Sequence, residues 1–375
     1  MKITLDRGRF AEAVGYAARA LPSRPPVPVL AGALIEASDD TVSVSAFDYE
    51  ASRKARVPAT VHTAGSVLVS GRLLSDITRS LPQQPVELVT EGPRLLLSCG
   101  SSRFTLPTLP IGEYPALPLM PSSAGIVSGS VLAAAVQQVA VAAGRDDTLP
   151  VLTGIKVEIE GGQITLAATD RYRFAVRTLG WNPADSDVSV HALVPAPILL
   201  ETAKSVDGAD VVEIALGTGA RDGLIGFEIP DRRTTTRLLD GDFPKFRSLF
   251  PKEFASVAHV STDALADAVK RVSLVAERNT PILCTFSEGQ LTLAAGSGDD
   301  AQATDQLPAD LEGDDISIAF NPHYFLDGLT ATGLPFVRLS LVSRTKPALL
   351  QGSTGAGADA DDAYQYLIMP VRVSG

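Results

Sequence analysis

The densest group of reactive side chains in this sequence is Thr169-Asp-Arg-Tyr-Arg. It places a carboxylate, a phenol and two guanidinium groups within five positions, which could serve as an acid/base cluster. The segment lies between two strand-like runs, and such a corner is more often a turn or a binding edge than a catalytic centre. We therefore expect a structural or binding role here. An unrelated α+β enzyme that uses Asp170, Tyr172 and Arg173 is the weaker alternative.

The other reactive residue types form no catalytic or metal-binding pattern. The acidic pairs Asp299-Asp300 and Asp361-Asp362 are predicted to be solvated turns, and Cys99 and Cys284 lie in apolar runs typical of buried thiols. The sequence contains neither a phosphate-binding loop of the Walker type nor a nucleophile elbow. The four histidines also lack metal-ligand spacing; they are His62, His191, His259 and His323. We expect no metal, no cofactor and no catalysed reaction.

Composition narrows the class of protein further. The chain has 375 residues, 45% of them hydrophobic, which suggests two or three domains with substantial cores. No run of the sequence resembles a secretory signal or a membrane span, so we expect a cytoplasmic protein. The net charge of −11 argues against a nucleic-acid binder, unless the positive charges gather on one face.

An internal repeat supplies the elements that must position these side chains. Three strands joined by two turns are predicted in Thr148–Arg177, and weaker copies occupy Pro26–Arg56 and Thr280–Ala303. An internal repeat is the sequence signature of a modular fold. We predict three similar α+β domains, at residues 1–120, 121–250 and 251–375.

Each repeat also contains two helical patterns. In the first repeat, Phe10, Ala13, Val14, Tyr16 and Ala17 recur at helical spacing. The second helices are predicted to begin at Ser70, Pro195 and Asn321, and the first of them carries the apolar stripe Leu73, Leu74, Ile77 and Leu81. The final strand is predicted over 364–373. Two helices per domain would pack on one face of antiparallel sheets.

The predicted helices are mildly basic in an acidic chain. A weakly basic helical face suits contact with nucleic-acid phosphates without reading bases, and an ordinary solvated face explains it equally well. The cations of these helical segments and of the loop beside the first include Arg24, Arg72, Arg79, Lys204, Lys270, Arg271 and Arg278.

Several longer motifs resemble those of one family, the bacterial DNA polymerase III β sliding clamps. They are the opening MKITLDRGRF, Arg24-Pro-Pro-Val-Pro-Val-Leu, Pro150-Val-Leu-Thr-Gly, Ala168-Thr-Asp-Arg-Tyr-Arg-Phe-Ala, Asp240-Gly-Asp-Phe-Pro-Lys-Phe-Arg and Tyr366-Leu-Ile-Met-Pro-Val-Arg-Val. The resemblance implies a head-to-tail homodimer whose six domains close into a ring around double-stranded DNA, with the helices inside and the seven cations named above facing the DNA. It also implies the partners, namely the α subunit of the replicative polymerase, the clamp loader and other proteins with a clamp-binding motif. A duplicate clamp with a specialised role, as a scaffold or in inhibitor tolerance, is the alternative.

The resemblance further implies a peptide-binding pocket between the second and third domains. Its matching positions are Leu152, Thr169, Arg171, Tyr172, Arg173, Phe174, Pro244, Ser248, Leu249, Leu367, Met369, Pro370, Val371 and Arg372. Partners would insert a short motif containing glutamine and apolar residues. The corner Thr169–Phe174 is unlike the corresponding segments of the other two repeats, so we place partner binding there.

Overall fold

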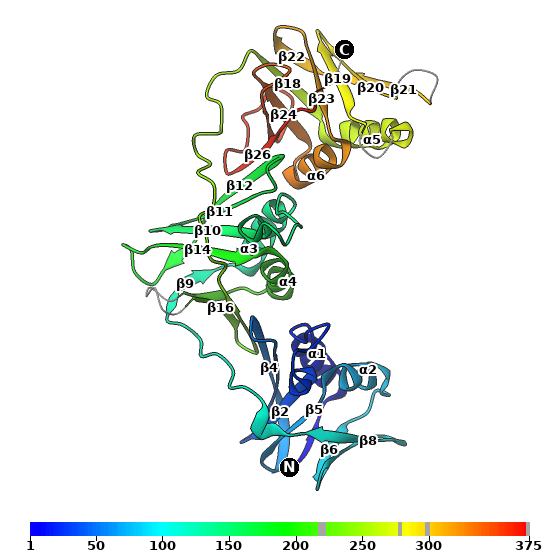
Figure 1. Ribbon diagram of the computed structural model, residues 1–375, viewed down its shortest axis with the longest axis vertical. Helices are drawn as coiled ribbons and strands as arrows, with labels where there is room; N and C mark the ends of the chain where they lie inside the picture. The colour runs from blue at the N-terminus through cyan, green and yellow to red at the C-terminus, as the bar shows by residue number, and fades with distance from the viewer. Residues whose placement is uncertain (217–222, 277–279, 297–300, 373–375) are drawn as a thin grey trace. The chain divides into compact units, whose positions relative to one another are not determined.

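A computed structural model describes residues 1–216, 223–276, 280–296 and 301–372 (Figure 1). These residues form two compact units. Unit 1 comprises residues 1–128, 183–185 and 208–238, and unit 2 comprises residues 129–182, 186–207 and 239–375. The two units do not coincide with the three predicted domains, so the predicted domain boundaries stay a prediction.

Unit 1 is built on one large antiparallel sheet. Its strands lie in the order β1-β6-β7-β8-β5-β2-β3-β4-β17-β16-β15-β9. Helices α1 (Arg7–Ala18) and α2 (Gly71–Ser80) lie side by side against these strands in Figure 1. The strand bounds are β1 Lys2–Leu5, β2 Gly32–Ser38, β3 Thr41–Phe47, β4 Ala51–Thr63, β5 Gly65–Ser70, β6 Val86–Glu91, β7 Arg94–Cys99, β8 Ser102–Leu109, β9 Ser123–Val127, β15 Val212–Leu216, β16 Leu224–Ile229 and β17 Arg232–Arg237. Two 3-10 turns, Pro28–Ala31 and Ile111–Glu113, complete the unit, and the short strand β13 (Asn182–Pro183) lies where the chain leaves unit 2.

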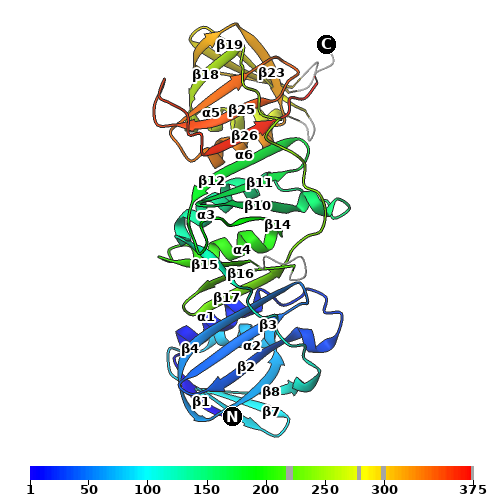
Figure 2. The ribbon, with the colours of Figure 1, turned by 90° about the vertical axis from the view of Figure 1, so that its left-hand side faces the viewer.

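Unit 2 contains two sheets and four of the α-helices described. The larger sheet has the order β14-β10-β11-β12-β26-β25-β24-β18-β22, much of which can be followed in Figure 2, and the smaller has the order β21-β20-β19-β23. The helices are α3 Gly129–Ala140, α4 Ala196–Val206, α5 Thr262–Val272 and α6 Pro322–Thr332, with 3-10 turns at Pro150–Thr153 and Ser273–Val275. The strands are β10 Gly154–Glu160, β11 Gln163–Thr169, β12 Arg173–Gly180, β14 Ser189–Pro195, β18 Ser256–Ser261, β19 Ile282–Ser287, β20 Gln290–Ala295, β21 Ala303–Pro308, β22 Asp310–Gly313, β23 Ile316–Phe320, β24 Phe336–Leu341, β25 Ala348–Ser353 and β26 Tyr364–Ile368.

The helices follow from local sequence signals. Asp6 caps α1, since its carboxylate accepts the backbone N–H of Arg9 at 2.9 Å, and the five predicted apolar residues of α1 are all buried. The second helices begin after Ser70, Pro195 and Asn321, as predicted. One residue of the α2 stripe was predicted wrongly. Leu73 is 46% exposed, because the buried face of this helix is completed by Gly71, Ser75 and Thr78 instead.

The last strand is shorter than predicted. β26 ends at Ile368, and the backbone N–H of Met369 then bonds to the carbonyl of Tyr172 at 2.8 Å. Pro370 has no N–H to offer a ladder, and the N–H of Val371 bonds to Ala319 instead. The chain end therefore joins several elements of unit 2 rather than extending one sheet.

The corner at Asp170 has a structural counterpart that the sequence did not reveal. In unit 1, the Asp48 carboxylate accepts the backbone N–H groups of Glu50 and Ala51. In the same way, the Asp170 carboxylate accepts the N–H groups of the residues two and three positions after it. The residue after each aspartate has a positive φ, 75° at Tyr49 and 80° at Arg171. Between the first two repeats, the expectation of an unshared corner is thus wrong for the aspartate and for the backbone around it.

Candidate peptide-binding site

An apolar cavity of about 200 Å³ lies in unit 2 where four chain segments meet. Nine of the fourteen residues predicted for the pocket line it: Leu152, Thr169, Arg171, Arg173, Phe174, Pro244, Leu249, Leu367 and Met369. Its volume suits a few apolar side chains of a peptide rather than a large cofactor.

Strand pairing brings two of these segments together, although they are far apart in the sequence. β12 and β26 are antiparallel neighbours, with Phe174 opposite Leu367 and Arg173 opposite Ile368. Phe174 and Leu367 are both buried, and Met369 follows with 41% of its surface exposed. The cavity therefore has a rigid floor and an exposed, adaptable methionine at its edge.

The Asp170 corner fixes the rim of the cavity. The Asp170 carboxylate accepts the backbone N–H groups of Tyr172 at 3.0 Å and Arg173 at 3.1 Å. The Thr169 hydroxyl donates to the Arg173 carbonyl at 2.7 Å and accepts the N–H of Arg171 at 3.1 Å. These bonds close a tight Asx-type turn. The carboxylate that could have acted as a base is thus occupied in holding the turn.

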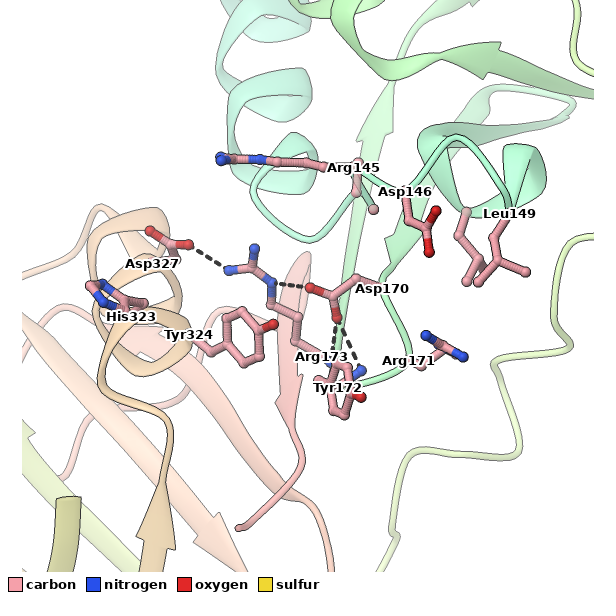
Figure 3. A pocket seen from close by; sticks show the side chains of 13 residues that line it. Arg145, Asp146, Leu149, Asp170, Arg171, Tyr172, Arg173, His323, Tyr324 and Asp327 are labelled. Atoms are coloured by element: carbon pink, nitrogen blue, oxygen red, sulfur yellow. Dashed lines mark hydrogen bonds and ion pairs between the residues drawn. The ribbon is translucent and has the colours of Figure 1, made fainter. Parts of the chain in front are cut away.

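Arg173 joins this corner to helix α6. Its Nε lies 2.9 Å from Asp170, one terminal nitrogen lies 2.5 Å from Asp327, and the guanidinium covers the Tyr324 ring at 4.4 Å (Figure 3). Burial opposes the charge of Arg173, but Tyr366 and the two carboxylates outweigh it and raise the pKa of the guanidinium. Arg173 is therefore a permanently charged bridge between β12 and α6.

A second, polar cleft of about 650 Å³ shares Arg173 with this cavity. Figure 3 shows Tyr172 and Tyr324 in this cleft, and their rings stack at 6.1 Å. The remaining lining residues are Ala143, Gly144, Arg145, Asp146, Leu149, Leu152, Asp170, Arg171, Arg173, His323 and Asp327. Leu152, Arg171 and Arg173 line both hollows, so the two are adjacent.

Five predicted pocket residues do not line the apolar cavity. Tyr172 lines the polar cleft, whereas Ser248, Pro370, Val371 and Arg372 line neither of the two hollows. Sequence reasoning also missed residues that support the cavity from behind, among them Phe243, Phe246 and Phe250. The dense phenylalanine spacing of 243–254 was the available signal.

The residues predicted to face DNA are exposed wherever they are described. Arg24, Arg72 and Arg79 belong to unit 1, on α2 or the loop after α1. Three others in unit 2 form local ion pairs, Lys204 with Glu201, Lys270 with Asp267 and Arg271 with Asp305. Arg278 lies outside the described residues, as does the Asp299-Asp300 pair.

The remaining reactive residues have ordinary structural surroundings. Asp361 pairs with Arg177 at 2.8 Å, and Asp362 accepts the Gln351 amide at 2.9 Å. Both cysteines are buried. In the described part of the chain, no three His, Cys, Asp or Glu residues are arranged to hold a metal ion, and no helix there is long and apolar enough to cross a membrane.

Comparisons with known proteins agree with this arrangement. Sequence models of the N-terminal, central and C-terminal domains of the DNA polymerase III beta subunit match residues 1–118, 126–245 and 247–372. The beta sliding clamp of Streptomyces coelicolor is 60% identical over the full length of both chains, and the beta sliding clamp homolog GriR of Streptomyces muensis is 45% identical over 99% of each. A solved structure of the Bacillus subtilis sliding clamp superposes with a TM-score of 0.92 at 27% identity, covering both chains completely. The chain belongs to the DNA polymerase III beta subunit family, the bacterial sliding clamps.

Proposed function

We propose that two copies of this chain close head to tail into a ring of six clamp domains that encircles duplex DNA. The three family matches, in order along the chain, support three domains per copy, with boundaries near 120 and 250. The ring would slide without reading sequence and would act by topology rather than by catalysing a reaction. A ring on chromosomal DNA would work in the cytoplasm.

The exposed cations of the helices are proposed to face the DNA. Arg24, Arg72 and Arg79 would contact phosphates, together with Lys204, Lys270, Arg271 and Arg278. Contacts of this kind supply affinity and orientation without base recognition. An acidic chain can still bind DNA in this way, because the net charge of −11 is a sum over the whole chain and one face can be positive.

The apolar cavity is proposed to take a short peptide from the polymerase α subunit, the clamp loader or another partner. The observation that carries this proposal is the convergence of nine predicted residues, from four segments, on one cavity. A peptide side chain would lie against Phe174, Leu367 and Met369, and polar groups at the rim would orient it. Because the ring keeps the partner near DNA, modest peptide affinity would suffice.

Retention on closed DNA tests the topological part of the proposal. Chains loaded onto a nicked circle should remain bound through gel filtration and should be released when the circle is cut. The free protein should elute near twice 39.2 kDa. Equal release from circular and linear DNA would contradict the ring.

A specialised duplicate clamp is the second candidate, and the 45% identity to the GriR homolog is the observation in its favour. The 60% identity to the Streptomyces coelicolor clamp favours the ordinary clamp role. Deleting the gene distinguishes the two: loss of a specialised copy leaves replication intact, and loss of the main clamp is lethal.

A further inference from the structure

One wall of the apolar cavity comes from a linker that has little backbone support. Pro244 and Leu249 lie in the irregular segment between β17 and β18. Among the described residues, the only backbone hydrogen bond made by residues 240–254 joins the N–H of Leu249 to the carbonyl of Phe246, within the segment itself. The position of this wall must therefore depend on side-chain attachments.

The first attachment is aromatic. Phe174 of β12 contacts three linker phenylalanines, with ring centroids 5.8 Å away at Phe243, 5.3 Å at Phe246 and 6.2 Å at Phe250. These distances are within the range of favourable aromatic pairs. Phe174 also lines the cavity, so the linker and the cavity floor share one anchor. Packing of this kind holds the linker close to the sheet but allows it to slide.

The second attachment is an ion pair that fixes one point of the linker. Glu158 lies on β10 with its side chain only 4% exposed, and its carboxylate is 2.7 Å from Lys156 and 2.7 Å from Arg247 of the linker. The Arg247 guanidinium also covers the Phe246 ring at 5.2 Å. Burial opposes the charge of Glu158, but Lys156 and Arg247 outweigh it and lower the pKa of the carboxyl. The Arg247 side chain is 61% exposed while the carboxylate that it contacts is buried, so loss of Arg247 leaves one of the two buried carboxylate oxygens without a cationic partner.

We propose that Glu158 and Arg247 are positioning residues for peptide binding, which hold the linker so that Pro244 and Leu249 form the cavity wall. This inference rests on the proposed peptide-binding function. Neither residue lines the cavity, so both act through the linker. Breaking the pair leaves the aromatic attachment in place and frees the wall to move away from the floor. A bound peptide would then have to reorder the wall, which weakens binding.

The test measures the affinity of a fluorescently labelled peptide with one glutamine and two large apolar residues. Glu158→Gln and Arg247→Gln should each weaken binding roughly tenfold, mainly through faster dissociation. The double variant should be no weaker than the single ones, because both remove the same interaction. Arg247→Lys keeps the charge and should recover most of the affinity. Arg247→Gln removes an exposed side chain and leaves Glu158 paired with Lys156, so this variant keeps the test valid if Glu158→Gln fails to fold.

The matched control is Glu36→Gln, which breaks the ion pair between Glu36 and Lys54 on the unit 1 sheet. It should leave peptide affinity unchanged. Amide hydrogen exchange should accelerate at Leu249, whose N–H makes the one backbone hydrogen bond of this linker, in the Glu158 and Arg247 variants, and strands β10 to β12 should stay protected. Peptide affinity within twofold of the unsubstituted chain would overturn the positioning role. Failure of the unsubstituted chain to bind any such peptide would instead contradict the proposed function itself.

Discussion

Arg171 holds a conformation that its residue type disfavours. Its φ of 80° lies in the left-handed region, where a Cβ atom costs about 1 kcal/mol or more. The Asx turn around Asp170 offsets this free-energy cost. The hydrogen bonds from the N–H groups of Tyr172 and Arg173 to Asp170 constrain the backbone of Arg171 between them. The exposed Arg171 side chain lines both the apolar cavity and the polar cleft. Backbone strain at a rim shared by two hollows is typical of functional positions.

The effect of substituting Arg171 on stability should therefore depend on the backbone preference of the new residue more than on its charge. Arg171→Gly should change the free energy of unfolding by less than about 0.5 kcal/mol, because relief of strain offsets the greater freedom of glycine in the unfolded chain. Arg171→Val should cost about 1–2 kcal/mol, since a β-branched residue tolerates positive φ poorly. Thermal or urea unfolding of both variants measures the difference.

The control is Arg145→Val, an exposed arginine of the same cleft that does not have a positive φ. It should leave stability nearly unchanged. Equal effects of valine at the two positions would show that backbone conformation at Arg171 carries no cost.

Helix α6 depends on one close approach between elements. A Cβ added at Gly328 would lie 2.5 Å from a ring carbon of Tyr366, whose side chain is fully buried. The Tyr366 hydroxyl donates to the Tyr324 carbonyl at 2.8 Å, and the Tyr324 ring packs under Arg173. Helix α6, strand β26 and the Arg173 bridge are thus packed as one body.

Gly328→Ala should accordingly destabilise the chain by about 1–3 kcal/mol, the usual cost of overpacking. It should also weaken peptide binding, because displacement of Tyr366 disturbs Arg173. Melting temperature and peptide affinity are the two measurements. Gly15 is the matched helical glycine, with no atom within 4 Å of an added Cβ. Gly15→Ala should stabilise by about 0.5–1 kcal/mol through helix propensity alone, and a stabilising Gly328→Ala would contradict the packing argument.

The elements were largely predictable from sequence, and the contacts between them were not. Helical spacing predicted the buried face of α1, and the starts of the second helices were also predicted, although only Asn321 caps its helix with its side chain, whereas Ser70 and Pro195 make no such bond. The pocket residues could be placed only through family resemblance, because no periodicity relates Leu152 to Met369. The ion pair from Arg173 to Asp327 joins residues 154 positions apart. The linker phenylalanines were not assigned to the pocket because they lie in a segment without regular structure.

At the scale of the whole molecule, charge and topology should contribute separately to DNA binding. Phosphate contacts weaken as salt rises, whereas a closed ring remains linked to a circle whatever the salt concentration. The exposed cations differ in availability. Arg72 donates to the Pro22 carbonyl at 2.9 Å and has no acidic partner in the described chain, whereas Lys204 and Lys270 are each paired with a carboxylate.

Removing Arg24 and Arg72 together should therefore reduce the salt dependence of binding to linear duplex. If each contacts one phosphate, the slope of log affinity against log salt should fall by about two. The double variant with Lys204→Ala and Lys270→Ala should change this slope less, because each lysine is already paired with a carboxylate. Retention on a closed circle should be the same for both double variants. Faster loss from circles without Arg24 and Arg72 would mean that these arginines hold the ring on DNA directly, and that topology alone does not.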